Sequence, residues 1–359
     1  MITALLFIAV LAVLVLAHEL GHFAVAKWSG MRVDEFGIGF PPKLFGVKRG
    51  DTEYTVNLIP LGGFVKIHGE SGEERGDPRS FASKPLFKRF LVLIAGVSMN
   101  VLLAWVLLSI GFMTGLPTAI DGGDFTGGDV RDEQVQITYV LPGSPADTVG
   151  LVLGDRVLSV NGQSAIDADQ TRSLIGLAQD GEELEIAIAR NGQTDPILVT
   201  VAPTQIEEGL IAIGTQLTTV GFVSFPPHLA LVHGATSTAN MVALTARGFW
   251  DLIGRLISGQ GLGMDVSGPV GIAVLTGEVA DMGFVYLLNF AAVLSVNLAI
   301  LNILPFPALD GGRVFFLLIE LVRRKPVTPK IEASVHAAGF ALLMILVVLV
   351  TYKDILRFF

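Results

Sequence analysis

Four long apolar runs dominate this sequence and restrict what the chain can fold into. We interpret them as membrane-spanning helices, at residues 1–26, 90–116, 284–309 and 337–356. A helix needs about 20 consecutive apolar residues to cross the hydrocarbon core of a bilayer. The composition agrees, because 51% of the residues are hydrophobic and only 16% are charged, which is unusually apolar for a soluble domain. The sequence therefore predicts a polytopic α-helical membrane protein with four transmembrane helices.

The first apolar run could instead be a cleaved signal peptide. No Lys or Arg precedes it, and it continues into a charged motif at residues 18–22 rather than into a cleavage site of small residues. We therefore expect a retained helix.

The charged residues predict the orientation of the chain. The connectors 27–89 and 313–330 hold 11 and 5 Lys or Arg residues, whereas the long connector 117–283 holds 6 basic and 20 acidic residues. Short basic loops stay in the cytoplasm, while long domains cross a membrane with little regard for charge. We expect the N-terminus and the acidic connector to face outward. The acidic connector has no basic patch for nucleic acid, and the chain has no cysteine for disulfide or thiol chemistry.

Two further segments are expected to lie at the membrane. Residues 33–68 alternate loosely between apolar and polar positions and are rich in Gly, Pro and β-forming residues, which predicts membrane-associated β-strands. Residues 229–257 have an amphipathic helical spacing, typical of helices on the membrane surface. A fifth span there would bury Arg247, Asp251 and Arg255, which is costly in a bilayer.

The acidic connector contains a small inserted α+β domain. We expect a linker at 117–134, followed by strand-like runs and turns over 135–203, among them the turn at Asn191-Gly192. The run GSPADTVGLVLGDRVLSVNG, which begins at Gly143, resembles the PDZ family closely. The resemblance implies a peptide-docking module whose peptide ligand is unknown, because PDZ folds do not share one function.

The first span ends in His18-Glu19-Leu20-Gly21-His22. Residues four apart share one face of a helix, so His18 and His22 can point at one metal ion. Glu19 is then close enough to act as a general base on a water. The alternative is that the motif is only the cytoplasmic end of a helix that reaches for water, but ionisable residues in an apolar helix are candidates for function.

A catalytic zinc site needs a third protein ligand. The candidate is Asp310, because the third span is expected to run inward and to end near the depth of His18 and His22. The remaining histidines, His68, His228, His233 and His336, are scattered along the chain. Asp310 could alternatively be a simple helix cap, although one carboxylate also suits the charge of Zn²⁺ in a site of low dielectric constant.

Two prolines are expected to break the third span beside the metal. Neither Pro305 nor Pro307 can continue a helix, and backbone freed at membrane depth survives only where it lines a cavity or meets a partner. Asn302 could bind either this broken backbone or a substrate strand. A simple kink is the alternative.

These motifs together resemble the site-2 protease family of intramembrane zinc metalloproteases, in particular its bacterial regulator-of-sigma-E protease branch. The resemblance covers nearly the whole chain and includes VDEFGIGF, PLGGFVKI, SGPVGIA at 267–273 and SVNLAILNILPFPALDGG. This chain differs from the well-known members of the family in one respect, because it has room for only one PDZ domain where they carry two. It also has Gly96-Val97, followed by Ser98 and Asn100, where many relatives have Gly-Pro.

The resemblance implies a fold and a set of site residues. It implies a Zn²⁺ site of His18, His22 and Asp310 with Glu19 as the catalytic base, and a membrane re-entrant β-sheet built from the 33–67 strands. It also implies that Asn302, Pro305 and Pro307 help to bind substrate. A transmembrane substrate must become extended before hydrolysis, so pairing with a sheet edge would replace its helical hydrogen bonds. Gly62, Gly63 and the 63–67 strand are the candidate edge.

The resulting hypothesis is a protease of the bacterial inner (cytoplasmic) membrane. Its substrates would be single-span membrane proteins, such as anti-sigma factors of a stress response, and remnant signal peptides. Two other classes compete with it. A catalytically idle PDZ scaffold would tolerate a damaged motif, and a zinc transporter would place ionisable residues along a path across the bilayer. Here the four residues His18, Glu19, His22 and Asp310 are all present and are expected at one depth.

Overall fold

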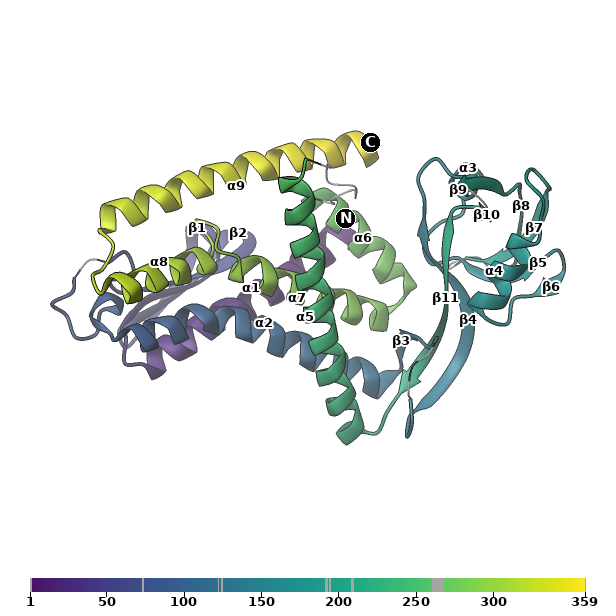
Figure 1. Cartoon of the computed structure of the whole chain (residues 1–359). Helices are drawn as coiled ribbons and strands as arrows, with labels where there is room; N and C mark the ends of the chain where they lie inside the picture. The colour runs from purple at the N-terminus through teal and green to yellow at the C-terminus, as the bar shows by residue number, and fades with distance from the viewer. Residues whose placement is uncertain are drawn as a thin grey trace. The chain divides into compact units, whose positions relative to one another are not determined.

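The computed structural model describes residues 2–72, 74–121, 123, 125–190, 193, 195–207, 210–259 and 268–358. The predicted turn at Asn191-Gly192 and Ser267 of the SGPVGIA run lie outside these residues. The chain divides into two compact units (Figure 1). The first unit comprises Met1–Leu108, Gly234–Glu278 and Leu288–Phe359, and the second comprises Ser109–His233 and Val279–Leu287.

In the described part of the chain, four helices are long and apolar enough to cross a membrane. They are α1 (Ile2–Trp28), α2 (Leu86–Thr114), α7 (Phe284–Ile303) and α9 (Pro329–Phe358). The third expected span, 284–309, is shorter than predicted, because the helix ends at Ile303 and α8 (Asp310–Arg323) begins only after the two prolines. The protein is therefore built as a membrane protein with four long apolar helices.

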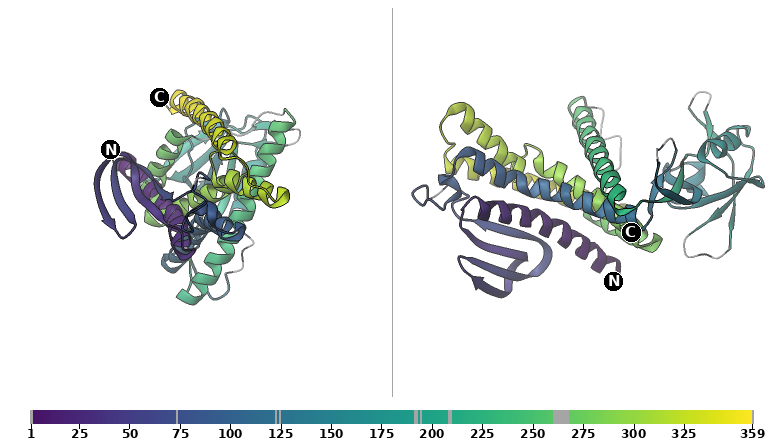
Figure 2. Two further views of the ribbon diagram at one scale, coloured as in Figure 1. Left: turned by 90° about the vertical axis from the view of Figure 1, so that its left-hand side faces the viewer. Right: turned by 90° about the horizontal axis from the view of Figure 1, so that it is seen from below.

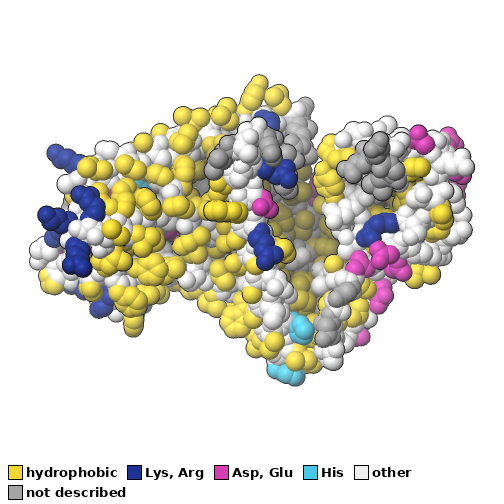
Figure 3. Space-filling view, in the orientation of Figure 1, with side chains coloured by type: hydrophobic (Ala, Val, Ile, Leu, Met, Phe, Trp, Pro, Cys, Tyr) yellow, Lys and Arg dark blue, Asp and Glu magenta, His cyan; other side chains and the backbone are white. Residues whose placement is uncertain are grey.

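The remaining helices are more polar or shorter. The amphipathic segment forms one continuous helix, α5 (Pro227–Ile257), on which Arg247, Asp251 and Arg255 are all exposed. The helix α6 (Pro269–Met282) follows. On the face shown in Figure 3, Lys and Arg side chains gather at the end of the first unit where α8 is connected to α9. Arg323, Arg324 and Lys325 are exposed in that connection.

The strands β1 (Val33–Arg49) and β2 (Thr52–Ile67) pair with each other beside α1 (Figure 2). Residues 36–38 pair with 63–65 on one side and with 54–56 on the other side. Residues 63–67 consequently form an edge of this sheet, and no further strand pairs with them in the described part of the chain. Aromatic contacts join the sheet to α1, since the Phe23 ring lies 5.2 Å from Phe36.

The second unit is built on a seven-stranded sheet, in which two-residue β6 (Gln163–Ser164) pairs with β5 beside the main path. The other strands follow the order β3 (Leu116–Ala119), β11 (Thr215–Ser224), β4 (Asp129–Val140), β5 (Arg156–Val160), β7 (Leu184–Ala189) and β8 (Ile197–Val201). The short strands β9 (Thr204–Glu207) and β10 (Leu210–Ala212) pair separately. The helices α3 (Pro145–Thr148) and α4 (Ala168–Gly176) lie between strands in the sequence.

The expected boundaries of the inserted domain need correction. Residues 117–134 are not simply a linker, because β3 and the first half of β4 belong to the sheet. The sheet does not end at residue 203 either, since β11 comes later in the chain and lies between β3 and β4. The sequence pattern identified local strands but did not show which of them pair.

The residues that resemble the PDZ family form an ordered framework. Ser144 caps α3, where its side chain accepts a hydrogen bond from the backbone N–H of Asp147. Asp155 is fully buried and is bound by Arg190 at 2.6 Å. The Asn161-Gly162 turn has positive φ angles of 49° and 75°, which glycine and asparagine tolerate best. These residues therefore fix turns, a helix start and one ion pair with a buried carboxylate.

Candidate metal centre

His18 and His22 lie four residues apart on α1 and are both buried. Their Nε2 atoms are 3.1 Å apart. This proximity follows from helix geometry, because side chains at i and i+4 lie on one face. The first span therefore presents two imidazole nitrogens at one point.

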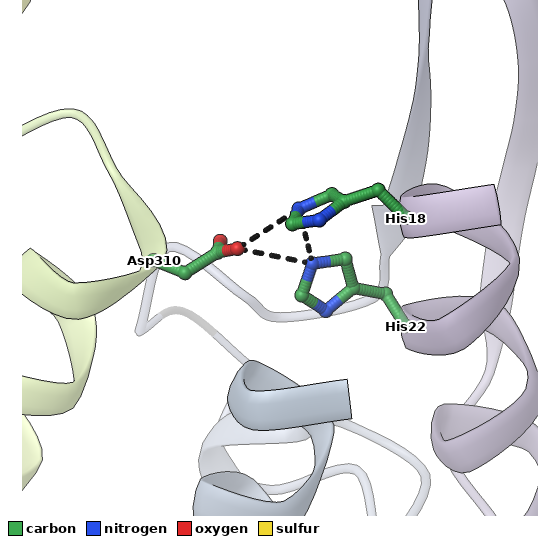
Figure 4. Close-up of side chains that lie close together, drawn as sticks. All are labelled: His18, His22 and Asp310. Atoms are coloured by element: carbon green, nitrogen blue, oxygen red, sulfur yellow. Dashed lines mark hydrogen bonds and ion pairs between the residues drawn. The ribbon is translucent and has the colours of Figure 1, made fainter. Parts of the chain in front are cut away.

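Asp310, the first residue of α8, approaches this pair from a distant part of the sequence (Figure 4). Its Oδ2 lies 3.0 Å from His18 Nε2 and 3.2 Å from His22 Nε2. In the described part of the chain, these three residues form the one group of His, Cys, Asp or Glu side chains close enough to share a metal ion.

The chain reaches this arrangement because α7 stops and the backbone turns back before α8 starts. Pro305 and Pro307 lie in the break, and Ala308 has a left-handed φ of 82°. A Cβ atom on Gly311 would lie 2.1 Å from the Leu304 carbonyl oxygen, and one on Gly312 would lie 2.4 Å from that of Phe306. The two glycines after Asp310 therefore permit the broken segment to fold closely onto the start of α8.

The three donors fit a zinc ion. With metal–ligand distances near 2.0–2.1 Å, tetrahedral ligands lie about 3.3 Å from one another. The separations of 3.0, 3.1 and 3.2 Å come close to this value. Two histidines and one carboxylate are also a donor set of catalytic zinc sites, which keep a fourth position open.

The surroundings orient the His22 ring for metal binding. Its Nδ1 donates to the Val92 carbonyl oxygen of α2 at 2.8 Å, which leaves the Nε2 lone pair free. Gly96, one turn further along α2, lies against both rings. A Cβ atom there would lie 2.3 Å from His22 Nε2 and 2.7 Å from His18 Cε1.

Asn100 takes a similar position toward His18. Its amide nitrogen lies 3.3 Å from His18 Nδ1, while its Oδ1 is buried without a hydrogen-bond partner among the described residues. A half-turn of the amide exchanges oxygen and nitrogen. The oxygen then accepts the Nδ1 proton of His18, which frees Nε2 for a metal. The backbone of Asn100 is also held in place, because Ser295 Oγ of α7 donates a hydrogen bond to its main-chain carbonyl oxygen at 2.8 Å.

A cavity of about 430 Å³ opens beside the three donors. Glu19, Asn302, Gly62 and Gly63 line it together with His18 and Asp310, and apolar side chains such as Leu11, Val15 and Phe40 complete the wall. Pro305 and Pro307 are not among its described lining residues. The structure thus brings most of the predicted site residues to one cavity and places the two prolines in the loop behind it.

The other histidines lie elsewhere. His68 pairs with Glu74 and also lies 3.4 Å from Asp34 and 3.3 Å from Asp77. The His233 ring stacks on Phe225 at 3.9 Å. His336 Nδ1 accepts a hydrogen bond from the backbone of Ala308. The sequence patterns did not point to Gly96, Asn100 or His336 as site residues, although Gly96 and Asn100 stand four residues apart on one helix face.

Comparisons with known proteins identify the family of this chain. The family model described as Peptidase family M50 matches residues 6–346. A Clostridium perfringens protein named as a zinc metalloprotease is 39% identical over 345 residues, covering 96% of this chain and 95% of the relative. The zinc metalloprotease RasP of Geobacillus kaustophilus is 33% identical, and the match covers 98% of this chain and 97% of the relative.

Two further similarities concern one relative and one solved structure. The regulator of sigma-W protease RasP of Bacillus subtilis is 30% identical, covering 99% of each chain. A solved PDZ domain of an SdrC-like protein from Listeria monocytogenes is 22% identical and covers 25% of this chain and 92% of that chain. Its TM-score of 0.23 is too low to support an argument about the fold.

Proposed function

The chain belongs to peptidase family M50, and we propose that it cuts transmembrane segments of single-span membrane proteins at a zinc centre formed by His18, His22 and Asp310. Its family makes it a zinc metalloprotease, and its four long apolar helices make it a membrane protein. One observation carries the proposal. Three donor atoms from opposite ends of the chain meet within 3.2 Å, beside a cavity that Glu19 also lines.

Each site residue has a chemical role. When bound, zinc supplies Lewis acidity toward a peptide carbonyl and lowers the pKa of a water molecule. His18, His22 and Asp310 would hold the ion. Glu19 lines the same cavity, so its carboxylate can accept a proton from water there and pass it to the departing amine. Asn302 also lines this cavity, and its side-chain amide can donate a hydrogen bond to the substrate backbone or accept one from it.

The sheet edge offers a way to hold an extended substrate. Residues 63–67 have backbone groups without a strand partner on one side in the described sheet, and Gly62 and Gly63 line the cavity. A Cβ atom on Gly63 would lie 3.6 Å from Glu19 Cγ. A substrate strand that pairs with this edge therefore runs beside the catalytic base and recovers hydrogen bonds lost when its helix unwinds.

We propose that this sheet re-enters the membrane. Its outer surface carries many exposed apolar side chains, including Phe40, Leu44, Phe45, Leu58 and Ile59. Contiguous apolar surface of this kind marks contact with a membrane or a partner. The exposed basic residues of the α8–α9 connection support a cytoplasmic position for the active-site end, and we expect the N-terminus and the PDZ domain to be external. Reporters fused near residues 75 and 325 should read cytoplasmic, and one near residue 165 external; the reverse pattern would contradict this orientation.

The relatives indicate a substrate class. The Bacillus subtilis relative is named as a regulator of a sigma factor, which supports anti-sigma factors of a stress response as substrates in the bacterial inner membrane. Remnant signal peptides share the same chemistry, since each is a single apolar helix that must be unwound before cleavage.

The test is cleavage of a single-span model substrate by the purified protein, with zinc content measured on the same sample. Glu19→Gln should keep zinc but lose about 10²- to 10⁴-fold in rate, because it removes a proton acceptor rather than a ligand. Asp310→Ala should lose both activity and zinc. Glu278→Gln, an exposed position on α6, is the control. Normal cleavage by Glu19→Gln or by Asp310→Ala would overturn the proposal.

A further inference from the structure

The last helix, α9, carries none of the metal donors, yet it contacts the loop that leads to Asp310. The backbone N–H of Ala308 donates to Nδ1 of His336 at 2.9 Å. One helical turn further along α9, a Cβ atom on Gly339 would lie 2.3 Å from Pro307 Cβ and 2.6 Å from its carbonyl oxygen. The α9 backbone therefore lies directly against residues 307–308.

Ala308 has a conformation that alanine does not favour. Its φ of 82° brings the Cβ atom close to backbone oxygen, and residues other than glycine adopt such angles only where the surroundings impose them. The hydrogen bond to His336 uses the N–H of this same residue. His336 is thus placed to stabilise the unfavourable backbone of Ala308.

The chemistry of the ring defines what His336 supplies. Because Nδ1 accepts a hydrogen bond, the proton of the neutral ring lies on Nε2. Nε2 is buried and has no hydrogen-bond partner among the described residues, and the ring packs 5.5 Å from Phe316 of α8. The ring therefore serves as a fixed hydrogen-bond acceptor between α8 and the loop.

Ala308 and Leu309 also line the cavity beside Glu19, and Asp310 follows directly. We propose that His336 is a positioning residue: by holding Ala308 in its left-handed conformation, it sets the direction in which the chain enters α8 and presents the Asp310 carboxylate to the two histidines. The inference rests on the proposed zinc centre, and it adds a function for the last helix beyond anchoring the chain in the membrane.

The first test compares zinc release from full-length purified protein into a chelator. His336→Leu removes the acceptor and should release zinc about 10–100-fold faster, the size of effect expected when a group that orients a ligand is lost. His336→Asn should stay close to the parent protein, because its Oδ1 lies at the branch point where Nδ1 lies and can accept the same hydrogen bond. Val335→Ala, an exposed neighbour, is the control.

A second substitution tests the backbone argument. Ala308→Gly in the His336→Leu background should recover part of the zinc retention, since glycine adopts positive φ without the Cβ contact. If His336→Leu does not fold, His336→Gln replaces it: the Gln oxygen lies one bond further from Cα, so Asn should retain zinc better than Gln.

The outcomes separate this inference from the proposed function. Parent-like zinc release by His336→Leu, or equal release by the Asn and Gln variants, would overturn the positioning role. A parent protein that binds zinc through His18, His22 and Asp310 but does not cut membrane substrates would overturn the proposed function, while the zinc comparison would still decide the function of His336.

Discussion

Gly96 of α2 lies against the rings of both histidines of the site. A side-chain carbon at this position would lie 2.3 Å from His22 Nε2, a distance that real Cβ atoms do not show. Because the atom it would meet is a metal donor on a buried ring, the clash cannot be relieved by moving a flexible side-chain end. Even Gly96→Ala, which adds only one methyl group, should therefore displace the His22 ring.

We expect Gly96→Ala to bind zinc about 10–100-fold more weakly, as observed generally when the orientation of a ligand is disturbed. The helix itself should be unharmed, since Ala has the higher helix propensity. Zinc affinity measured by chelator competition checks this expectation. Gly248→Ala on α5, where an added Cβ meets nothing within 4 Å, is the matched control. Equal affinity of both variants would show that the rings adjust freely.

Asn100 should be replaceable by a residue that keeps an acceptor. Asp at position 100 can accept the His18 Nδ1 proton, as carboxylates do for many zinc-bound histidines, whereas Leu of similar size cannot. We expect Asn100→Leu to lose zinc more readily than Asn100→Asp in the same competition assay. A reversed order would mean that the amide nitrogen, not the oxygen, faces His18.

The residues proposed to bind zinc and to act as the base could be named from the sequence, but the residues that contact and orient them could not. His18, Glu19 and His22 follow from spacing on one helix, and Asp310 follows from the expected depth of a second helix. Gly96 and His336 act on residues more than 25 positions away through packing between helices. Periodicity within one helix contains no information on which neighbouring helix faces it, so these two residues appear only in the structure.

At the scale of elements, α6 starts on a carboxylate from another helix. Asp354 of α9 is buried and accepts hydrogen bonds from the N–H groups of Gly268 and Gly271, at 3.1 and 2.7 Å. The first N–H groups of a helix have no partner within the helix itself, and water is scarce for a group this well buried. A residue of α9 therefore performs the capping that a local Ser or Asp usually provides.

Asp354→Leu should destabilise the protein by about 0.5–2 kcal/mol, the range for a lost N-cap. Asp354→Asn should retain part of this stability, because its oxygen can still accept one hydrogen bond. The thermal unfolding midpoint in detergent, and protease cleavage near the start of α6, are the measurements. Lys353→Met changes an exposed neighbour and should have no effect. An unchanged midpoint for Asp354→Leu would show that the cap contributes nothing.

The elements themselves were predictable to different degrees. The four apolar runs became long helices because length and hydropathy alone decide that outcome. The pairing of β1 with β2 was harder to predict from the sequence. Residues 36–38 pair with two separate parts of β2, and strand pairing depends on residues that lie far apart in the sequence. The same reason explains why the sequence does not assign β11 to the inserted domain.

At the scale of the whole molecule, the inserted domain is expected to select substrates by size. An external domain cannot take part in hydrolysis at the cytoplasmic end of a bilayer core of about 30 Å. It can still obstruct substrates that carry a folded outer domain. The acidic connector favours this function over docking of a free C-terminus, because like charges repel.

The test replaces the whole sheet, residues 116–224, by a flexible linker, since removing only 135–203 would cut β4 in two and take away the β4 residues that pair with Thr215–Thr219 of β11. Two substrates that share one transmembrane segment, with and without a folded outer domain, are compared. Obstruction predicts that only the bulky substrate is cut faster by the shortened enzyme. Docking predicts a higher KM for both substrates instead, and unchanged discrimination would contradict the selection by size.

The three donors of the metal centre come from opposite ends of the chain, with His22 and Asp310 separated by 288 residues. A ribosome that adds about 5–20 residues per second needs roughly 15 to 60 s to make this stretch. During that time the first helix is already in the membrane with two histidines and a glutamate, but without its carboxylate partner. With the proposed zinc site, a growing chain therefore lacks its third metal ligand, and cannot itself hydrolyse a neighbouring membrane protein, until Asp310 has been made.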